Sequence, residues 1–284
     1  MTGTRSAIRI PEAWVVEERK KVGPFVTHER YRLPDGSHRT WDSRRHRKTG
    51  RVDEQHKPVE HPWWRPRLLG WWVAALFIAG SFLFALGSFP PYAAHVDARI
   101  VGVTYFLGSI FFTSAGYLQY VQTINAPDDL TPGTGIGHRT RFLALQPHRI
   151  DWWAASVQSV GTLLFNVSTY SAMNAAFSPQ QQERRVWAPD MFGSIAFMVA
   201  STLAWIEVCD GWWAWRPHET PWRIVALNLI GSIAFQVSAI AAFIRPATGE
   251  VANVTLANLG TFVGAVGFLL AAVLLIPELA DRSD

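Results

Sequence analysis

The sequence has one cysteine, Cys209, and only 17% of its 284 residues are charged. A single cysteine excludes an intrachain disulfide framework and any metal site built from cysteines alone. Soluble domains carry roughly a quarter charged residues, and the shortage here is uneven. Residues 1–67 hold 16 of the 26 Lys and Arg residues and 9 of the 22 Asp and Glu residues. The chain therefore divides into a basic N-terminal segment, residues 1–67, and an apolar remainder.

A secretory signal peptide is not expected, because the first long apolar run begins near Leu68, behind the whole basic segment. From there, six apolar windows each have about the length needed to cross a hydrocarbon core of about 30 Å as a helix. The predicted fold class is therefore all-α: a polytopic membrane protein with six transmembrane helices. The windows are Leu68–Phe89, Ile100–Gln122, Trp152–Met173, Met191–Cys209, Ile224–Phe243 and Val254–Ile276, and residues 277–284 form a short tail.

The six windows contain no His, Lys or Arg. This absence argues against haem ligation by paired histidines, arginine-based voltage sensing and a lysine Schiff base within the membrane. The flanking charges predict the orientation. With the N-terminus inside, the outer loops hold only four of the 26 Lys and Arg residues, namely Arg99, Arg184, Arg185 and Arg245. The positive-inside rule then predicts a cytoplasmic-membrane protein with both termini in the cytoplasm.

Every window contains a Gly, a small residue directly after it and a Phe four positions after it, which indicates an internal repeat. Before every second window, a Pro precedes a Trp by five positions and the motif Gly by fourteen, as in Pro66, Trp71 and Gly80. The repeating unit is therefore a two-helix hairpin, expected three times, near residues 66–125, 147–209 and 217–276. The motif residues are Gly80 and Phe84, Gly108 and Phe112, Gly161 and Phe165, Gly193 and Phe197, Gly231 and Phe235, and Gly264 and Phe268.

The motif Gly and Phe lie on one helix face. Small residues let helix backbones approach closely in lipid, so helix packing is the favoured interpretation, and a permeation path lined by Gly and Ser is the alternative. A hairpin with Gly-Ser-Ile-x-Phe followed by small residues resembles the YrhK-like family of small bacterial membrane proteins. The resemblance covers about residues 66–276 and implies a membrane hairpin without catalytic residues. This chain departs from it by triplication and by its basic N-terminal segment.

Polar side chains inside the windows are the next candidates, because they are costly in hydrocarbon without a partner. Gln158 and Asn228 stand three positions before a motif Gly, and Asn166 and Gln236 stand five positions after one. We expect these four amides to bond to one another across the helix contact. A pathway for water or a polar solute between the second and third hairpins is the alternative.

Glu207 is the only formally charged residue in the six windows. It lies near the inner end of the fourth window. We expect it to reach the interface, or to pair with Arg216 or Arg223. A role in proton or ion coupling is the alternative.

The basic N-terminal segment is expected to be partly disordered. Within it, a Pro-Asp-Gly turn lies between two short polar and apolar alternations, which predicts a β-hairpin near residues 31–41. Four basic residues follow closely, namely Arg44, Arg45, Arg47 and Lys48. We expect them to face anionic lipid of the inner leaflet, at about 1 kcal/mol for each basic residue. Docking to a cytoplasmic partner is the alternative, and nucleic-acid binding is disfavoured because few aromatic residues are interleaved.

The sequence has no Ser-His-Asp constellation, no His-Glu-x-x-His motif and no paired carboxylates, so no catalytic, cofactor or metal site is predicted. The favoured function is a non-enzymatic accessory or scaffold component of the membrane, acting with a protein partner or with a second copy of itself. One alternative is a transporter or channel for a small solute. The other is a membrane enzyme that acts on lipids through Glu207, Asp210 and His218.

Overall fold

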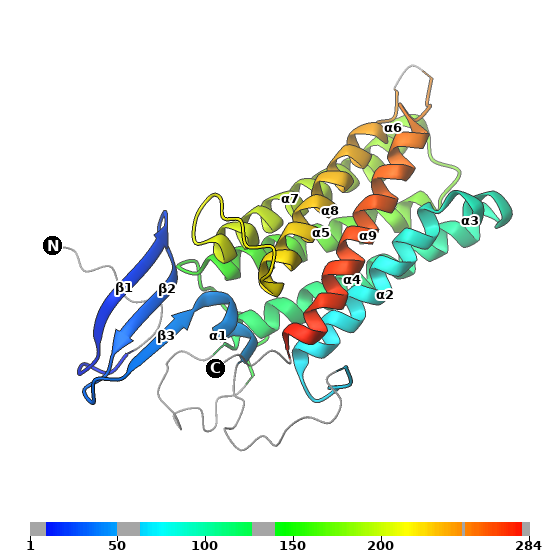
Figure 1. Ribbon diagram of the computed structural model, residues 1–284. Coiled ribbons are helices and arrows are strands. Elements are labelled where there is room, and N and C mark those ends of the chain that lie inside the picture. The colour runs from blue at the N-terminus through cyan, green and yellow to red at the C-terminus, as the bar shows by residue number, and fades with distance from the viewer. Residues whose placement is uncertain (1–9, 50–62, 127–139, 246–247, 280–284) are drawn as a thin grey trace.

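The computed structural model describes residues 10–49, 63–126, 140–245 and 248–279. Its largest part is a bundle of long helices, and a small β-sheet followed by a short helix, α1 (Ser43–Thr49), lies at one end of it (Figure 1). We call this end of the bundle the α1 end and the opposite end the far end.

Six long helices form a closed ring. Each packs against the next one along the chain, and the last packs against the first, so that the helices surround a central axis. In ring order they are α2 (Leu69–Ser88), α4 (Ala98–Ile124), α5 (Ile150–Ala172), α7 (Ala188–Cys209), α8 (Thr220–Ala241) and α9 (Val254–Glu278). Shorter helices lie toward the far end, namely α3 (Pro90–His95), α6 (Pro179–Gln182) and η1 (Glu183–Trp187).

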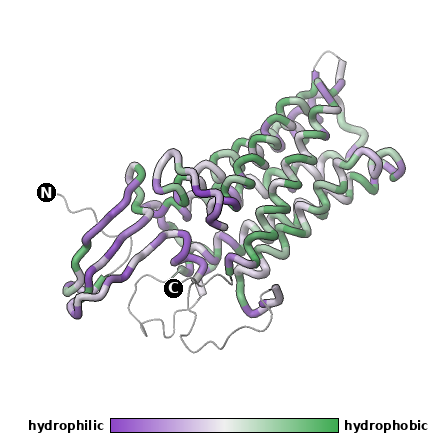
Figure 2. Tube along the Cα trace, viewed as in Figure 1, coloured by the Kyte–Doolittle hydropathy of each residue, from purple (hydrophilic) through white to green (hydrophobic). Residues whose placement is uncertain are grey.

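Five helical segments in the described part of the chain are long and apolar enough to cross a membrane. Apolar residues run along the ring helices, whereas the β-sheet is mostly hydrophilic (Figure 2). The helix α5 is not among the five, because amide and hydroxyl side chains such as Gln158 and Asn166 lower its hydropathy. The segment that contains α7 begins at Pro179, twelve residues before the predicted start, and therefore includes Asp190.

The N-terminal sheet has three antiparallel strands in the order β1–β2–β3. They are β1 (Val15–Val22), β2 (Phe25–Arg32) and β3 (His38–Asp42). The turn between β2 and β3 contains the Pro-Asp-Gly sequence, and Gly36 adopts a φ of +81°, a backbone conformation that favours glycine. The pattern used above did not reveal β1, whose exposed and half-buried residues do not alternate regularly.

Six phenylalanine rings fill the axis of the ring of helices. They are the motif residues Phe84, Phe112, Phe165, Phe197, Phe235 and Phe268, and all are buried. In the helix pairs α2–α4, α5–α7 and α8–α9, the centroids of the two phenyl rings lie 5.1–5.4 Å apart. Rings of α2, α5 and α8 lie 5.9–6.3 Å from one another, and those of α4, α7 and α9 lie 5.5–6.1 Å apart. We call these six rings the phenyl cluster.

Each motif glycine lies beneath a phenylalanine of its paired helix. A Cβ atom on Gly108 would lie 2.9 Å from the ring of Phe84, and one on Gly80 would lie 2.8 Å from the ring of Phe112. The same reciprocal contact joins α5 to α7 and α8 to α9. Glycine is therefore required because the partner ring occupies the space that a side chain would need.

The chain segments that lead into α2, α5 and α8 make the same hydrogen bond. Near the α1 end, the indole N–H of Trp71, Trp152 or Trp222 donates to the backbone carbonyl eight residues earlier, over 2.8–2.9 Å. The three acceptors are the carbonyl oxygens of Trp63, Ala144 and Ala214. These bonds fix how the chain enters each helix.

Candidate functional site

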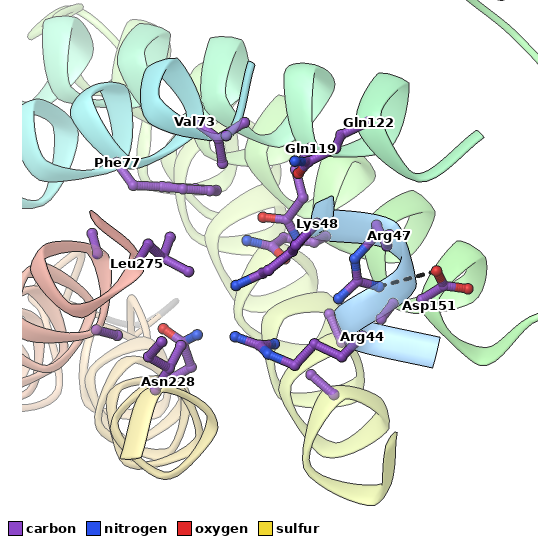
Figure 3. Close-up of a pocket in the computed structure, with 18 of the residues that line it drawn as sticks. Arg44, Arg47, Lys48, Val73, Phe77, Gln119, Gln122, Asp151, Asn228 and Leu275 are labelled. Carbon is purple, nitrogen blue, oxygen red and sulfur yellow. Dashed lines mark hydrogen bonds and ion pairs between the residues drawn. The ribbon is translucent and has the colours of Figure 1, made fainter. Parts of the chain in front are cut away.

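A cavity lies on the axis between α1 and the phenyl cluster. Its volume is about 80 Å³. One water molecule needs roughly 10–15 Å³, so the cavity has room for several. Phe268 of α9 lines it at the phenyl cluster. Phe77 lines it from α2, and Arg44, Arg47 and Lys48 line it from α1 (Figure 3). All six ring helices contribute to its wall.

The wall residues recur at fixed distances from the motif glycines. Seven offsets from the motif glycine are occupied by lining residues in two or all three helix pairs. Seven positions before the Gly stand Val73, Ala154 and Ile224; three before it stand Phe77, Gln158 and Asn228; eleven after it stand Gln119, Ala204 and Leu275. Fourteen positions after the Gly stand Gln122, Glu207 and Glu278, of which the first two line the cavity.

The helix α1 is positioned by the strand that precedes it. The carboxylate of Asp42, the last residue of β3, accepts a hydrogen bond from the backbone N–H of Arg45 over 3.1 Å, which caps the start of the helix. Basic residues occupy the last turn, where they complement the helix dipole. No loop separates β3 from α1, so the sheet holds the helix close to the end of the ring. The side chains of Arg44, Arg47 and Lys48 line the cavity from there.

Arg47 joins two carboxylates from different helices. Its guanidinium lies 3.1 Å from Asp151 of α5 and 3.4 Å from Glu207 of α7. Asp151 has no exposed surface and Glu207 is 3% exposed. Arg149 also bonds Asp151, over 3.0 Å, and the hydroxyl of Ser43 donates to Glu207 over 2.7 Å. Two positive and two negative charges thus balance at this side of the cavity.

Arg44 and Lys48 share a third carboxylate, Glu278 of α9. The Nε atom of Arg44 lies 2.9 Å from Oε1 of Glu278, and its Nη2 atom lies 3.2 Å from Oε2. The ammonium of Lys48 pairs with the same carboxylate. The helix α1 is therefore held by ion pairs to α5, α7 and α9.

The cations of α1 respond differently to burial. Burial by itself opposes the charge of Arg47, but the carboxylates of Glu207 and Asp151 outweigh this effect and raise the pKa of the guanidinium. For Lys48, burial and the repulsion of Arg44 prevail over the attraction of Glu278 and lower the pKa to about 7. Arg47 is thus charged at neutral pH, whereas the charge of Lys48 is sensitive to its surroundings.

These contacts correct two predictions. Arg44, Arg47 and Lys48 were expected to face lipid, but they point into the ring and pair with carboxylates, and only Arg45 of that basic cluster is exposed. Glu207 was expected at the interface or beside Arg216 or Arg223. It is buried against Arg47, because α1 covers the end of the ring and removes this carboxylate from the interface.

The four amides do not bond to one another, which corrects a third prediction. Gln158 lines the cavity and accepts from Gln119 over 3.4 Å, and Asn228 lines the cavity from α8. Asn166 lies between α4 and α5, where it bonds Ser109 and Thr113. Gln236 donates to the sulfur of Met191, between α8 and α7. The amides face three different places because α5 and α8 are not neighbours in the ring.

The sequence analysis missed Asp151 and Glu278. Asp151 directly precedes the third window, and Glu278 lies two residues after the end of the sixth. Both therefore fell outside the segments searched for buried charge. One signal was present: Glu207 and Glu278 both follow their motif Gly by fourteen positions. Aligning the hairpins beyond their apolar cores would have paired them.

The residues suggested for lipid chemistry do not meet in one site. Asp210 pairs with Lys20 of β1 and with Arg216, whereas Glu207 faces α1. His218 is exposed, in the turn before α8. Within the described part of the chain, no group of three or more His, Cys, Asp or Glu side chains is placed to hold a metal ion.

Comparisons with protein-family models, with curated proteins and with solved structures find no match to this chain. The resemblance to the YrhK-like family therefore stays a prediction from the sequence motif, and the function must be argued from the geometry of the ring, the cavity and α1.

Proposed function

We propose that the chain crosses the membrane six times, as three repeated hairpins that close into the ring of helices. The recurring glycine–phenylalanine contacts and the recurring indole hydrogen bonds support a repeat. The helix α5 would be the sixth span. Its outward face carries exposed Val160, Leu163 and Val167, which suit contact with lipid, and its polar side chains point toward neighbouring helices.

The six-span topology predicts that the two ends of α5 lie on opposite sides of the membrane. In a Cys209→Ser background, a cysteine at exposed Ala175 is expected to react with a membrane-impermeant maleimide in intact cells. A cysteine at Leu143, which is 81% exposed, is expected to react only after permeabilisation. Equal labelling of both would show that α5 does not span, and the reverse pattern would contradict cytoplasmic termini.

We infer further that the protein is a non-enzymatic scaffold of the cytoplasmic membrane. In this proposal the ring is a rigid anchor that holds the sheet and α1 at the inner face for a protein partner. The single observation that carries it is the insertion of α1 into the ring, where ion pairs to three helices attach the sheet to the anchor. The phenyl cluster supports it as well, because six packed rings leave the axis closed to solutes.

The exposed face of the sheet is the surface for a partner in this proposal. Arg30 and Arg32 are exposed there, and their ion pairs with Glu17, at 3.9 and 3.6 Å, are worth about 0–1 kcal/mol. Replacing both arginines by alanine should therefore leave the fold intact. We expect a protein that co-purifies stoichiometrically with the full chain in nanodiscs to be lost from this double variant.

The matched control replaces Arg184 and Arg185 by alanine, since both are exposed near the far end of the bundle. It should retain the partner. Quantitative mass spectrometry of the purified samples measures both results. Absence of any stoichiometric partner from the unaltered chain, or solute flux through proteoliposomes, would contradict the scaffold proposal.

One observation favours a second candidate, a transporter or channel for a small solute. The cavity lies on the axis of the ring, where Gln158 and Asn228 line it. A pathway would require the phenyl cluster to separate, which would break contacts between all three helix pairs. The scaffold is preferred because it needs no such change.

A further inference from the structure

The charges around the cavity do not balance. Arg47 and Arg149 face two carboxylates, Asp151 and Glu207. On the other side, Arg44 and Lys48 share one carboxylate, Glu278. With Lys48 protonated, the described residues of this second group carry one positive charge in excess, in surroundings that are largely shielded from water.

An unbalanced charge away from water is unfavourable, and a site can remove it by losing a proton or by binding a counter-ion. Loss of a proton from Lys48 is one way, since burial and the repulsion of Arg44 lower the pKa of this lysine to about 7. The other charges near Lys48 are Arg47 on α1 and Glu278 on α9. Of the remaining helices, α5 and α7 contribute Asp151 and Glu207 to the cavity, both paired with Arg47, and α2, α4 and α8 contribute no charged side chain to it. Binding of a monovalent anion is the other way, because it would neutralise the excess positive charge.

The cavity also offers hydrogen-bond donors to such an ion. The side chains of Arg44 and Lys48 extend together toward Asn228 (Figure 3). The Asn228 amide makes no side-chain hydrogen bond to any residue that the structure describes, so its N–H groups are available. Guanidinium and ammonium groups bind carboxylates through charge-assisted hydrogen bonds, and the Asn228 amide adds a neutral donor in the same cavity.

Part of the lining is apolar. Val73, Phe77, Ile224 and Leu275 border the cavity, and Phe268 borders it at the phenyl cluster, while Gln119, Gln122 and Gln158 add amide groups. A ligand with one negative charge and a short apolar tail matches the cations and the apolar part of this lining. The volume corresponds to roughly five to eight water-sized molecules, which suits a short carboxylate such as butyrate and excludes a lipid.

We propose that this cavity binds a short-chain monocarboxylate, with its carboxylate between Arg44, Lys48 and Asn228 and its apolar tail toward Phe77 and Phe268. The proposal goes beyond the scaffold function and does not depend on it, because a ligand in the cavity and a partner on the sheet use different surfaces. Loss of the partner would leave carboxylate binding unchanged.

Isothermal titration of the full chain in nanodiscs, with butyrate, acetate and chloride in turn, tests the ligand class. Two further methylene groups in an apolar wall should make butyrate bind about tenfold more tightly than acetate. Chloride, which has no tail, should bind no better than acetate. Equal affinity for all three anions, or no binding of butyrate, would overturn the proposal.

Two variants locate the site. Asn228→Leu removes the amide but leaves every ion pair of α1 in place, and it should weaken butyrate binding about tenfold. The control Gln236→Leu, on the same helix but outside the cavity, should bind normally. Unchanged binding by Asn228→Leu would place the ligand elsewhere.

Proton uptake gives a readout that a purely structural role of Lys48 would not produce. A bound carboxylate favours the protonated lysine, so binding should take up a fraction of a proton that grows from about pH 6 to about pH 8. Titrations in buffers with different ionisation enthalpies measure this fraction. It should vanish in Lys48→Met and persist in Arg45→Met, whose exposed position is on the same helix. Uptake in Lys48→Met equal to that of the unaltered chain would contradict the assignment.

Discussion

Replacing Arg47 by methionine is expected to release α1 from the ring. The change leaves Glu207 buried without a cationic partner and leaves Asp151 with Arg149 alone. Removing one partner of a buried ion pair costs about 3–5 kcal/mol, because the remaining charge keeps its desolvation penalty. Water can restore solvation only if α1 withdraws, so residues 43–48 should lose protection from hydrogen exchange.

Two further variants make this result specific. Arg45→Met alters the exposed basic neighbour on the same helix and should leave exchange unchanged. Glu207→Gln combined with Arg47→Met removes the unpaired charge, so the double variant should recover much of the lost protection. Slow exchange of α1 in the single variant Arg47→Met would show that the ion pairs do not hold this helix.

Replacing Gly264 by alanine is expected to have the second large effect. The added Cβ atom would lie 2.6 Å from the ring of Phe235 and 2.9 Å from the carbonyl oxygen of Gly231. The backbone of α8 cannot yield as a flexible side chain can, so α8 and α9 must separate. Overpacking of this kind costs about 1–3 kcal/mol, and we expect a lower midpoint in thermal unfolding of the protein in detergent.

The matched substitution is Gly102→Ala on α4. There, the nearest atom to the added Cβ is a side-chain carbon of Met173 at 3.1 Å, and a methionine side chain can move aside. This variant should unfold at nearly the same temperature as the unaltered chain. Equal destabilisation by both substitutions would mean that close contact beneath the phenylalanine rings is not what the motif glycines provide.

Much of the local structure could be predicted from the sequence. Apolar windows predicted where most of the long helices lie, since helix length and hydropathy depend on neighbouring residues only. The spacing of four between Gly80 and Phe84 predicted a shared helix face, and the structure places both toward α4. The spacing did not reveal which residue each would contact, because that depends on the register between two helices.

The candidate site was harder to predict. Arg44 and Glu278 are 234 positions apart, and Arg47 and Glu207 are 160 apart. No local pattern connects such pairs. A basic cluster beside a membrane segment is normally explained by anionic lipid, and only the position of α1 inside the ring shows that its charges meet carboxylates.

Local sequence was enough to predict the apolar helices, the faces on which glycine and phenylalanine lie and the polar N-terminal turn, because these follow from helical and strand periodicity. Only the packing of the whole chain showed that α9 packs against α2 and closes the ring, that six phenylalanine rings meet on the axis, and that α1 enters one end of the ring. These features depend on which surfaces remain to be buried once the helices have formed. Burial then brought two carboxylates, Asp151 and Glu207, and three cations of α1 from distant parts of the chain into a single cavity wall.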